Sequence, residues 1–155
     1  MRRRTREVLC LSALAVLVAT QARPLIAQSD EEAVKQTLVE MWDAIELGDL
    51  ERYETYVHDD FTSFGETDTY LNEGKEYELR SVRSWIERSA NIHTEMHQAE
   101  VTIRGDVAWI TYYWTDESTS RITGERATSR GKSTRIFVRE NGRWLCIHGH
   151  YTLAD

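Results

Sequence analysis

The segment from Lys132 to Thr152 constrains the fold most strongly, because it predicts a single β-hairpin. Ser133 to Arg139 alternates small, basic and apolar side chains, and Trp144 to Tyr151 is a second alternating run that is rich in aromatic residues. Glu140-Asn141-Gly142 separates the two runs, and Asn and Gly tolerate the positive φ that a tight connection requires. We therefore expect the rest of the chain to extend this sheet or to cover it with helices.

Three helices are predicted ahead of the sheet. The first begins at Ser29, which forms a capping-box pair with Glu32, and its apolar side chains follow one face as far as Gly48. Asp49 caps a short second helix. A third helix is predicted from Asn72 to Ala90, with its apolar side chains again on one side.

After the third predicted helix, the spacing of apolar side chains changes from the helical period to the alternation of strands. Helices followed by a run of antiparallel strands are typical of an α+β domain, in which the helices gather on one face of a strongly bent sheet. The four predicted strands are Ile92–Arg104, Val107–Ser118, Thr128–Arg139 and Arg143–Thr152.

Residues 1–27 have the pattern of a cleaved secretory signal peptide, which leaves 28–155 as one domain. Four of the first six residues are Arg. An apolar run from Val8 to Thr20 comes next, with small residues at Ala22 and Ala27. A bilayer span takes about 20 apolar residues, so this run favours a signal peptide over a retained anchor. We therefore expect a periplasmic or secreted protein without stable membrane association after cleavage.

Charge and cysteine content limit the partners and cross-links of the mature chain. Cleavage after Ala27 would remove five Arg and one Glu and change the net charge from -7 to -11. Such a charge repels nucleic acid and anionic membranes, so we expect neither as a partner. Cys146 would be the only cysteine left, which excludes an intrachain disulfide in an oxidising compartment.

Several short motifs occur in one order along the chain from Asp30 to Thr152. In this order they resemble the nuclear transport factor 2-like superfamily, a cone-shaped fold that includes ketosteroid isomerases and SnoaL-type polyketide cyclases. The resemblance implies a cone-like, strongly bent antiparallel sheet with three helices packed on its concave side. The motifs are Ala44–Leu50, His58–Phe61, Glu73-Gly74, Gly105–Ala108 and Asn141–Trp144, with His148 and His150.

Within that superfamily, three tripeptides are similar to the association domain of calcium/calmodulin-dependent protein kinase II. These are Ile92-His93-Thr94, Ser133-Thr134-Arg135 and His148-Gly149-His150. The similarity implies that Arg135 points into the cavity of the cone.

Alignment with the kinase domain places Tyr112, Trp114 and Tyr151 in the cavity with Arg135. One guanidinium among three rings suits a flat ligand that bears a carboxylate, because Arg binds carboxylate bidentately and the rings supply stacking area. The alternative is that the rings are core residues and that Arg135 pairs with an internal acid such as Glu66 or Asp116.

The ketosteroid isomerase pattern is incomplete in this chain. Met41 stands where that family places a Tyr, and Gly65 stands where it places its general-base Asp, with Glu66 one position on. Ser133-Thr134-Arg135 replaces the strand that supplies a neutral carboxylic acid donor. Proton abstraction beside a carbonyl needs a positioned base and oxyanion donors, so we do not expect steroid isomerisation.

Four residues are candidates for catalysis if the cavity is an active site. Glu66 is expected at the cavity mouth, and burial of Glu66 or Asp116 would raise its pKa toward the range of a general base. His148 and His150 lie on the last predicted strand, and strand alternation places them on one face with Trp144 and Cys146. A histidine pair two residues apart resembles no specific zinc motif, so no metal or other cofactor is predicted.

Three classes of function follow from these features. The favoured class is an exported domain that binds a small aromatic or carboxylate-bearing molecule in its cavity. The second is an enzyme of the cyclase, dehydratase or isomerase type, and the third is a homo-oligomeric assembly module without a ligand. Trp144, Ile136 and Val138 are predicted to make the outer face of the sheet apolar, which favours a homodimer.

Overall fold

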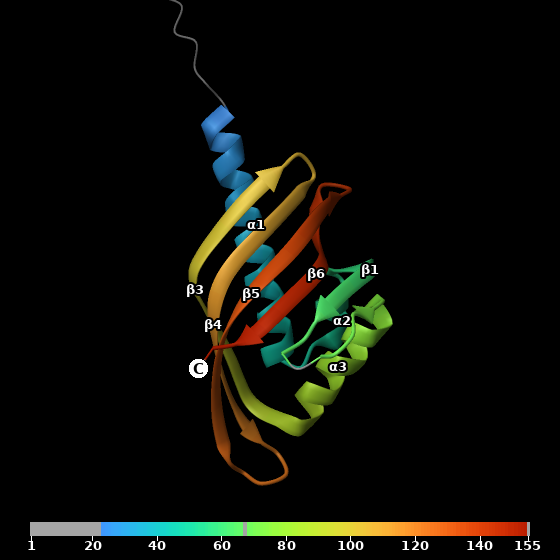
Figure 1. The fold of residues 1–155 in the computed structure, drawn as a ribbon, viewed down its shortest axis with the longest axis vertical. Helices are drawn as coiled ribbons and strands as arrows, with labels where there is room; N and C mark the ends of the chain where they lie inside the picture. The colour runs from blue at the N-terminus through green and yellow to red at the C-terminus, as the bar shows by residue number, and fades with distance from the viewer. Residues whose placement is uncertain (1–22, 67, 155) are drawn as a thin grey trace, which may run out of the picture.

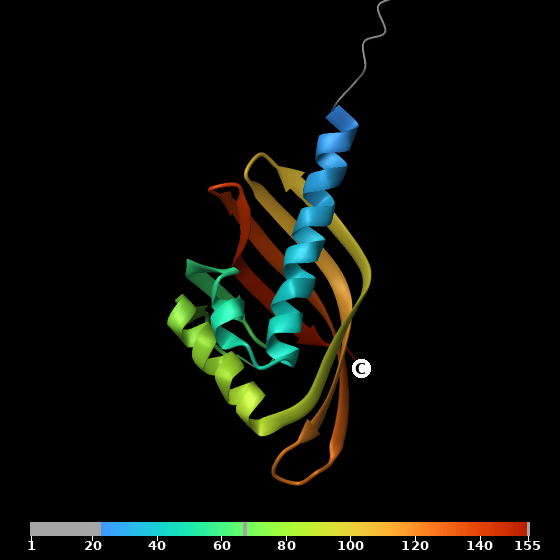
Figure 2. The same ribbon diagram turned by 180° about the vertical axis from the view of Figure 1, so that it is seen from behind.

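The computed structural model describes residues 23–66 and 68–154. A six-stranded, strongly curved sheet carries α1 along its concave face, and α2 and α3 lie beside the C-terminal end of α1 (Figures 1 and 2). The elements in chain order are α1 (Arg23–Glu46), α2 (Leu50–Glu54), β1 (Val57–Phe64), β2 (Asn72–Glu73), α3 (Lys75–Arg88), β3 (Ser89–Arg104), β4 (Val107–Ser120), β5 (Arg126–Glu140) and β6 (Arg143–Leu153).

The strand order is β2-β1-β6-β5-β4-β3. The four long strands therefore form a meander, and its last strand, β6, also pairs with β1. The neighbouring pairs are antiparallel except β1 and β6, which are parallel. The expected α+β architecture with a bent sheet and three helices is confirmed. The parallel pair was not expected, and it arises because α2 carries the chain from α1 to the far side of the hairpin.

The predicted C-terminal hairpin is present as β5 and β6. Glu140 pairs with Arg143, and the two residues between them have φ values of 49° at Asn141 and 78° at Gly142. Positive φ at both central residues defines the tight turn that matches the right-handed twist of the flanking strands. This local geometry fixes the register of the two central strands of the sheet.

The hydrophobic core lies between α1 and the concave face of the sheet. The apolar stripe of α1 supplies Val34, Leu38 and Met41, which are almost fully buried. Burial alternates along β4, where Ala108, Ile110, Tyr112 and Trp114 face inward. The helix and the strand therefore present their apolar sides to each other, as their different periods require.

Arg139 fastens the first described turns of α1 to the sheet. Its Nη1 donates to both carboxylate oxygens of Asp30 at 2.8 and 2.9 Å, and its Nε donates to Asp106 at 3.1 Å. The guanidinium also stacks on Trp144, with 4.7 Å from Cζ to the ring centroid. These charge-assisted contacts tie Asp30 of the helix to β5 and to the turn that holds Asp106.

Two predicted helix boundaries are wrong. The first helix begins at Arg23 rather than Ser29, and Pro24 falls in its first turn, where a missing N–H costs no hydrogen bond. The third begins at Lys75 rather than Asn72, because Asn72 pairs with β1 and Gly74 then turns the chain with φ of 87°. Residues 1–22, most of the predicted signal peptide, lie outside the described residues, and none of the described helices is long and apolar enough to cross a membrane.

A β-bulge in β6 overturns the predicted facing of its side chains. Phe137 pairs with Cys146 and Ile136 pairs with His148, so Ile147 is the extra residue of the bulge. Trp144 and Cys146 consequently face the core, where they are 5% and 0% exposed, and they do not share a face with His148 and His150. The prediction that Trp144 belongs to the outer face is therefore wrong.

We expect Gly131→Ala to destabilise the protein by about 1 to 3 kcal/mol, the usual cost of overpacking a tight site. A Cβ at Gly131 would overlap the Trp114 ring and lie 2.5 Å from the Thr152 carbonyl oxygen, which belongs to the backbone and cannot swing away. Urea unfolding measures the effect, and Lys132→Ala, an exposed neighbour, is the control. Equal stability of the two variants would show that the Trp114 side chain moves aside at little cost.

Candidate functional site

A cavity of about 570 Å³ lies between the concave face of the sheet and the three helices. Each helix and each strand contributes at least one wall residue, including Asn72 of the short β2 and Thr94 of β3. The volume is within the usual range for a small-molecule site. Among the predicted residues, the structure brings together in its wall Glu66, Tyr112, Trp114, Asp116, Arg135 and Tyr151.

Arg135 is the charged centre of the cavity wall. Its side chain is only 8% exposed, its Nη1 lies 3.8 Å from the Cys146 Sγ, and its Cζ lies 4.6 Å from the Tyr151 ring centroid. Nε is buried without a hydrogen-bond partner, and no salt bridge of the described residues includes Arg135. Arg135 therefore does not pair with Glu66 or Asp116, the internal acids considered from the sequence.

The charge of Arg135 persists despite its burial. Burial by itself lowers the pKa of the guanidinium, but the charges that Tyr151, Tyr112, Cys146 and Tyr53 would carry if ionised raise it, and the pKa lies well above its ordinary value. Burial conversely raises the pKa of Tyr151 and Tyr112, which keeps both phenols neutral. The site thus holds a permanent cation beside two hydroxyl groups.

Gly149 makes room for this arrangement. It pairs with Arg135 across β5 and β6, and it faces the cavity. A Cβ at this position would lie 2.8 Å from the Tyr151 hydroxyl oxygen and 3.2 Å from the Arg135 Nη1. The absence of a side chain at Gly149 therefore lets the Tyr151 ring lie against the guanidinium.

Trp114 and Tyr112 form the aromatic part of the wall from β4. Tyr112 packs edge-to-face on Trp42 of α1, with ring centroids 5.5 Å apart. Both β4 residues are largely buried, Tyr112 at 4% and Trp114 at 6% exposed. They belong to the core and to the cavity at once, because the cavity is a hollow within that core.

Glu78 is a wall residue that sequence reasoning missed. It lies on α3, is 6% exposed, and its Oε1 accepts a hydrogen bond of 2.5 Å from the Tyr53 hydroxyl of α2. Burial raises the pKa of Tyr53 well above its ordinary value, and the negative charge of Glu78 raises it further, so Tyr53 remains the donor. Glu78 lies one helical turn before Val82, on the apolar face of the helix. This position could have identified it from the sequence as a buried acid.

Glu66 and Asp116 form a second acidic group in the wall. Burial raises the pKa of both carboxyls, and the charge of Asp116 contributes to the shift of Glu66. The Oδ1 atom of Asp116 is buried without a hydrogen-bond partner among the described residues. An unpaired buried carboxylate oxygen costs free energy, so this acid opposes folding at neutral pH.

The two candidate histidines of β6 lie on the opposite face of the sheet from Arg135. His148 Nδ1 is 2.8 Å from the Thr62 hydroxyl, and Phe64 packs against both imidazoles with centroid distances of 6.2 and 5.7 Å. Burial lowers the pKa of His148, which favours the neutral ring. The described residues contain no group of three potential metal ligands.

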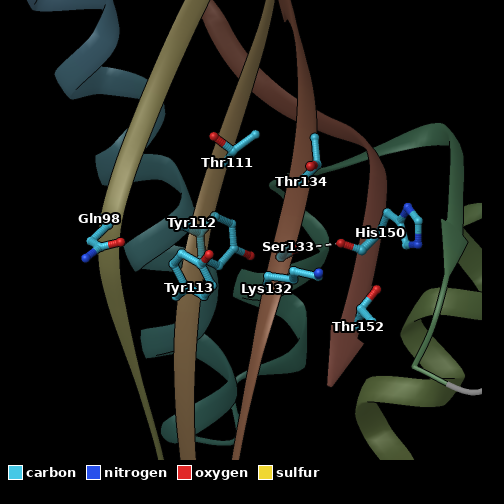
Figure 3. Close-up of a pocket in the computed structure, with 9 residues that line it drawn as sticks. All are labelled: Gln98, Thr111, Tyr112, Tyr113, Lys132, Ser133, Thr134, His150 and Thr152. Carbon is cyan, nitrogen blue, oxygen red and sulfur yellow. Dashed lines mark hydrogen bonds between the residues drawn. The ribbon is translucent and has the colours of Figure 1, made fainter. Parts of the chain in front are cut away.

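The outer face of the sheet carries a shallower hollow of about 360 Å³ (Figure 3). Its lining comes from β3, β4, β5 and β6 and consists mainly of polar side chains. The Ser133 hydroxyl donates a hydrogen bond of 2.8 Å to the His150 carbonyl oxygen. Figure 3 shows His150 beside this hollow, and His150 is not among the residues that line the main cavity. The outward-facing side chains around it include Gln98, Thr111, Tyr113, Lys132, Thr134 and Thr152.

The sequence of residues 34–155 matches the family model of the SnoaL-like domain. The chain belongs to this family. The resemblance to the nuclear transport factor 2-like superfamily, inferred from short motifs, is thereby confirmed. The match covers the four long strands, α2, α3 and most of α1, so the whole cavity lies within the family domain.

The proteins similar to this SnoaL-like domain include an animal kinase and several solved structures. A calcium/calmodulin-dependent protein kinase type II from Caenorhabditis briggsae is 31% identical over 128 residues, which are 77% of this chain and 23% of the kinase. The chain thus spans less than a quarter of that relative. A kinase II hub from S. rosetta is 23% identical with a TM-score of 0.66, covering 80% of this chain and 96% of the hub.

One solved structure that is named as an enzyme has the same fold as this SnoaL-like domain. A provisionally assigned dehydratase of the nuclear transport factor 2-like family from Streptomyces avermitilis is 17% identical, with a TM-score of 0.76. The alignment covers 83% of this chain and 99% of the dehydratase. Identity at this level supports the shared fold alone.

Asp116→Asn should stabilise this SnoaL-like domain in a pH-dependent way. Because the pKa of Asp116 is raised on folding, its contribution to stability is complete below the unfolded value of 3.8 and is lost as pH rises through the folded pKa. We expect the substitution to raise Tm by about 2 to 4 °C at pH 7 and to change it little near pH 3.5. Thermal unfolding at both pH values, with the exposed neighbour Glu117→Gln as control, measures this; an unchanged Tm at pH 7 would contradict it.

Proposed function

We propose that this SnoaL-like domain is exported and binds a small aromatic carboxylate in its cavity. The observation that carries the proposal is Arg135, a buried guanidinium that no acid of the described residues neutralises. A buried charge without a partner is costly, and a carboxylate ligand would supply the missing charge and hydrogen bonds. The empty space next to Arg135 is large enough for such a ligand.

The surroundings of Arg135 favour a flat ligand. The Arg135 guanidinium lies over the Tyr151 ring, and such stacking is a preferred arrangement of Arg on an aromatic face. Trp114 and Tyr112 present aromatic surface in the same wall. An aromatic ring on the ligand would bury apolar area against these side chains, while its carboxylate binds the guanidinium.

Export to the periplasm or out of the cell is part of the proposal. It is supported by the basic start of the chain, the 13-residue apolar run that follows and the small residues at Ala22 and Ala27. Cys146, the one cysteine beyond that segment, is fully buried in the structure. A buried single thiol is compatible with an oxidising compartment, since it has no partner for a disulfide and limited access to oxidants.

Catalysis in the same cavity is a second candidate, favoured by the acids of the wall. Burial raises the pKa of Glu66 and Asp116 toward the range of a general base, and Tyr112 and Tyr151 are neutral hydroxyl donors in the same wall. A reaction of the dehydratase, cyclase or isomerase type would use such a base with Arg135 to stabilise developing negative charge. The name of the Streptomyces avermitilis structure is compatible with this candidate.

Homodimerisation through the outer face of the sheet is a further part of the proposal. Ile136 pairs with Trp109, and Val138 pairs with Val107 and Leu145, so these partly exposed apolar side chains form one continuous patch on the convex side. Apolar patches of this kind mark association surfaces. An assembly role without a ligand is the third candidate, and the hub named among the similar structures supports it.

Replacing Arg135 should remove ligand binding without removing the fold. We expect Arg135→Gln to weaken binding of 3-phenylpropionate at least tenfold, because a hydrogen-bonded charge pair contributes about 1.5 to 3 kcal/mol. Isothermal titration calorimetry measures the affinity, and Arg130→Gln, an exposed position on the same strand, is the matched control. Equal affinity of wild type and Arg135→Gln, or no binding of any of a panel of aromatic carboxylates, would overturn the proposal.

A charge placed in the outer patch should prevent association. We expect Ile136→Glu to weaken a homodimer about 30-fold or more, since a central apolar contact contributes 2 kcal/mol or more. Sedimentation velocity across a concentration series measures this, with Arg83→Glu on the exposed side of α3 as control. A wild-type protein that is monomeric throughout the series would contradict the proposed dimer.

A further inference from the structure

Two opposite charges are buried in the same cavity without contacting each other. Glu78 and Arg135 are 6% and 8% exposed, and both line the cavity. None of the salt bridges among the described residues joins them. Buried charges are normally paired, because an isolated ion in a low-dielectric site loses its hydration without compensation.

Each of the two charged side chains contacts a tyrosine of the cavity wall. Tyr53 donates to Glu78 Oε1 at 2.5 Å, and Tyr151 covers the Arg135 guanidinium at 4.6 Å. The two charges also act on the same phenols: the pKa of Tyr53 and that of Tyr151 are each raised by burial and by Glu78, and lowered by Arg135. Glu78 and Arg135 therefore lie near enough to the same two phenols of the cavity wall to act on both.

The acid and the base both retain hydrogen-bonding capacity. Glu78 Oε1 accepts from Tyr53, whereas its Oε2 makes no hydrogen bond among the described residues. Arg135 Nε likewise has no partner, and the contact of its Nη1 with Cys146 Sγ is with a weak acceptor. Nε is enclosed by protein atoms, so a ligand would reach the Arg135 guanidinium through its terminal amino groups, and it would reach Glu78 through Oε2.

The balance of charge in the wall disfavours a simple anion. Four acids line the cavity, which are Glu66, Asp68, Glu78 and Asp116, whereas its basic residues are Arg88 and Arg135. Arg88 and Asp68 are exposed at the surface, where solvent screens them, and Glu78 and Arg135 are the deeply buried pair. A ligand with a carboxylate alone would satisfy Arg135 but would add a second negative charge near Glu78.

We infer that the natural ligand is an aromatic α-amino acid, whose carboxylate binds Arg135 and whose ammonium group binds Glu78. This inference rests on the proposed function and specifies its ligand class. An α-amino acid carries both charges on adjacent atoms, so it neutralises the two buried residues together. Its aromatic side chain lies in the remainder of the cavity, where Trp42, Trp85 and Trp114 supply apolar surface.

A matched series of ligands tests the ammonium contact on the intact protein. The series is L-phenylalanine, 3-phenylpropionate, which lacks the ammonium group, 3-phenyllactate, which has a hydroxyl in its place, and 2-phenylethylamine, which lacks the carboxylate. We expect calorimetry at pH 7 to show that phenylalanine binds at least tenfold more tightly than each of the other three. Charge-assisted hydrogen bonds to a buried carboxylate justify this ratio.

Glu78→Gln should abolish the preference for the ammonium group. The amide keeps the shape of the side chain and an acceptor for Tyr53, so phenylalanine and 3-phenylpropionate should bind within about threefold of each other. Glu87→Gln, on the exposed side of the same helix, is the matched control and should retain the wild-type preference. Circular dichroism and Tm measure whether each variant is folded. If Glu78→Gln does not fold, the ligand series on the wild-type protein still tests the inference.

The outcomes separate this inference from the proposed function. If 3-phenylpropionate or 3-phenyllactate binds as tightly as phenylalanine and requires Arg135, the amino-acid inference is wrong and aromatic carboxylate binding stands. If phenylalanine binds best and Glu78→Gln keeps that preference, the assigned role of Glu78 is wrong. If no compound of the series binds, both proposals are overturned.

Discussion

The buried guanidinium of Arg135 is the constraint around which the interior of the sheet is arranged. Its position on β5 faces inward, where a continuous apolar core would exclude it, and the chain accommodates it with three features. Gly149 leaves space beside it, Tyr151 stacks on it, and Cys146 offers a soft contact. A cavity next to such a group is expected physically, because filling that space with apolar side chains would leave the charge without any polar neighbour.

The acids of the wall show that this interior has not been selected for stability alone. Asp116 has a buried oxygen that no described residue pairs with, and Glu78 lies on the apolar face of α3 where a leucine would pack. Removing such groups usually stabilises a domain, and they persist most often at functional sites. Their presence on two different elements around one hollow therefore supports a role in recognition rather than an accident of packing.

Local sequence signals predicted most of the architecture, and long-range features escaped them. Asn141-Gly142 identified the hairpin because turn chemistry is local, and alternation located the four long strands. The bulge at Ile147 could not be seen from alternation, which assumes an unbroken period, so Trp144 was placed on the wrong face. Glu78 was overlooked for a related reason. The role of a charged side chain on an apolar helix face can be recognised only when its partner, here Tyr53, is known.

The bulge at Ile147 also explains how one sheet can carry two different surfaces. Before it, β6 directs Trp144 and Cys146 into the core; after it, the same strand directs Gly149 and Tyr151 into the cavity and His150 outward. Without the extra residue, Gly149 and Tyr151 would leave the cavity and the histidines would enter it, because strand facing alternates residue by residue. The cavity next to Arg135 and the apolar patch on the convex side are thus set by one register, and a change that shifts this register would alter both together.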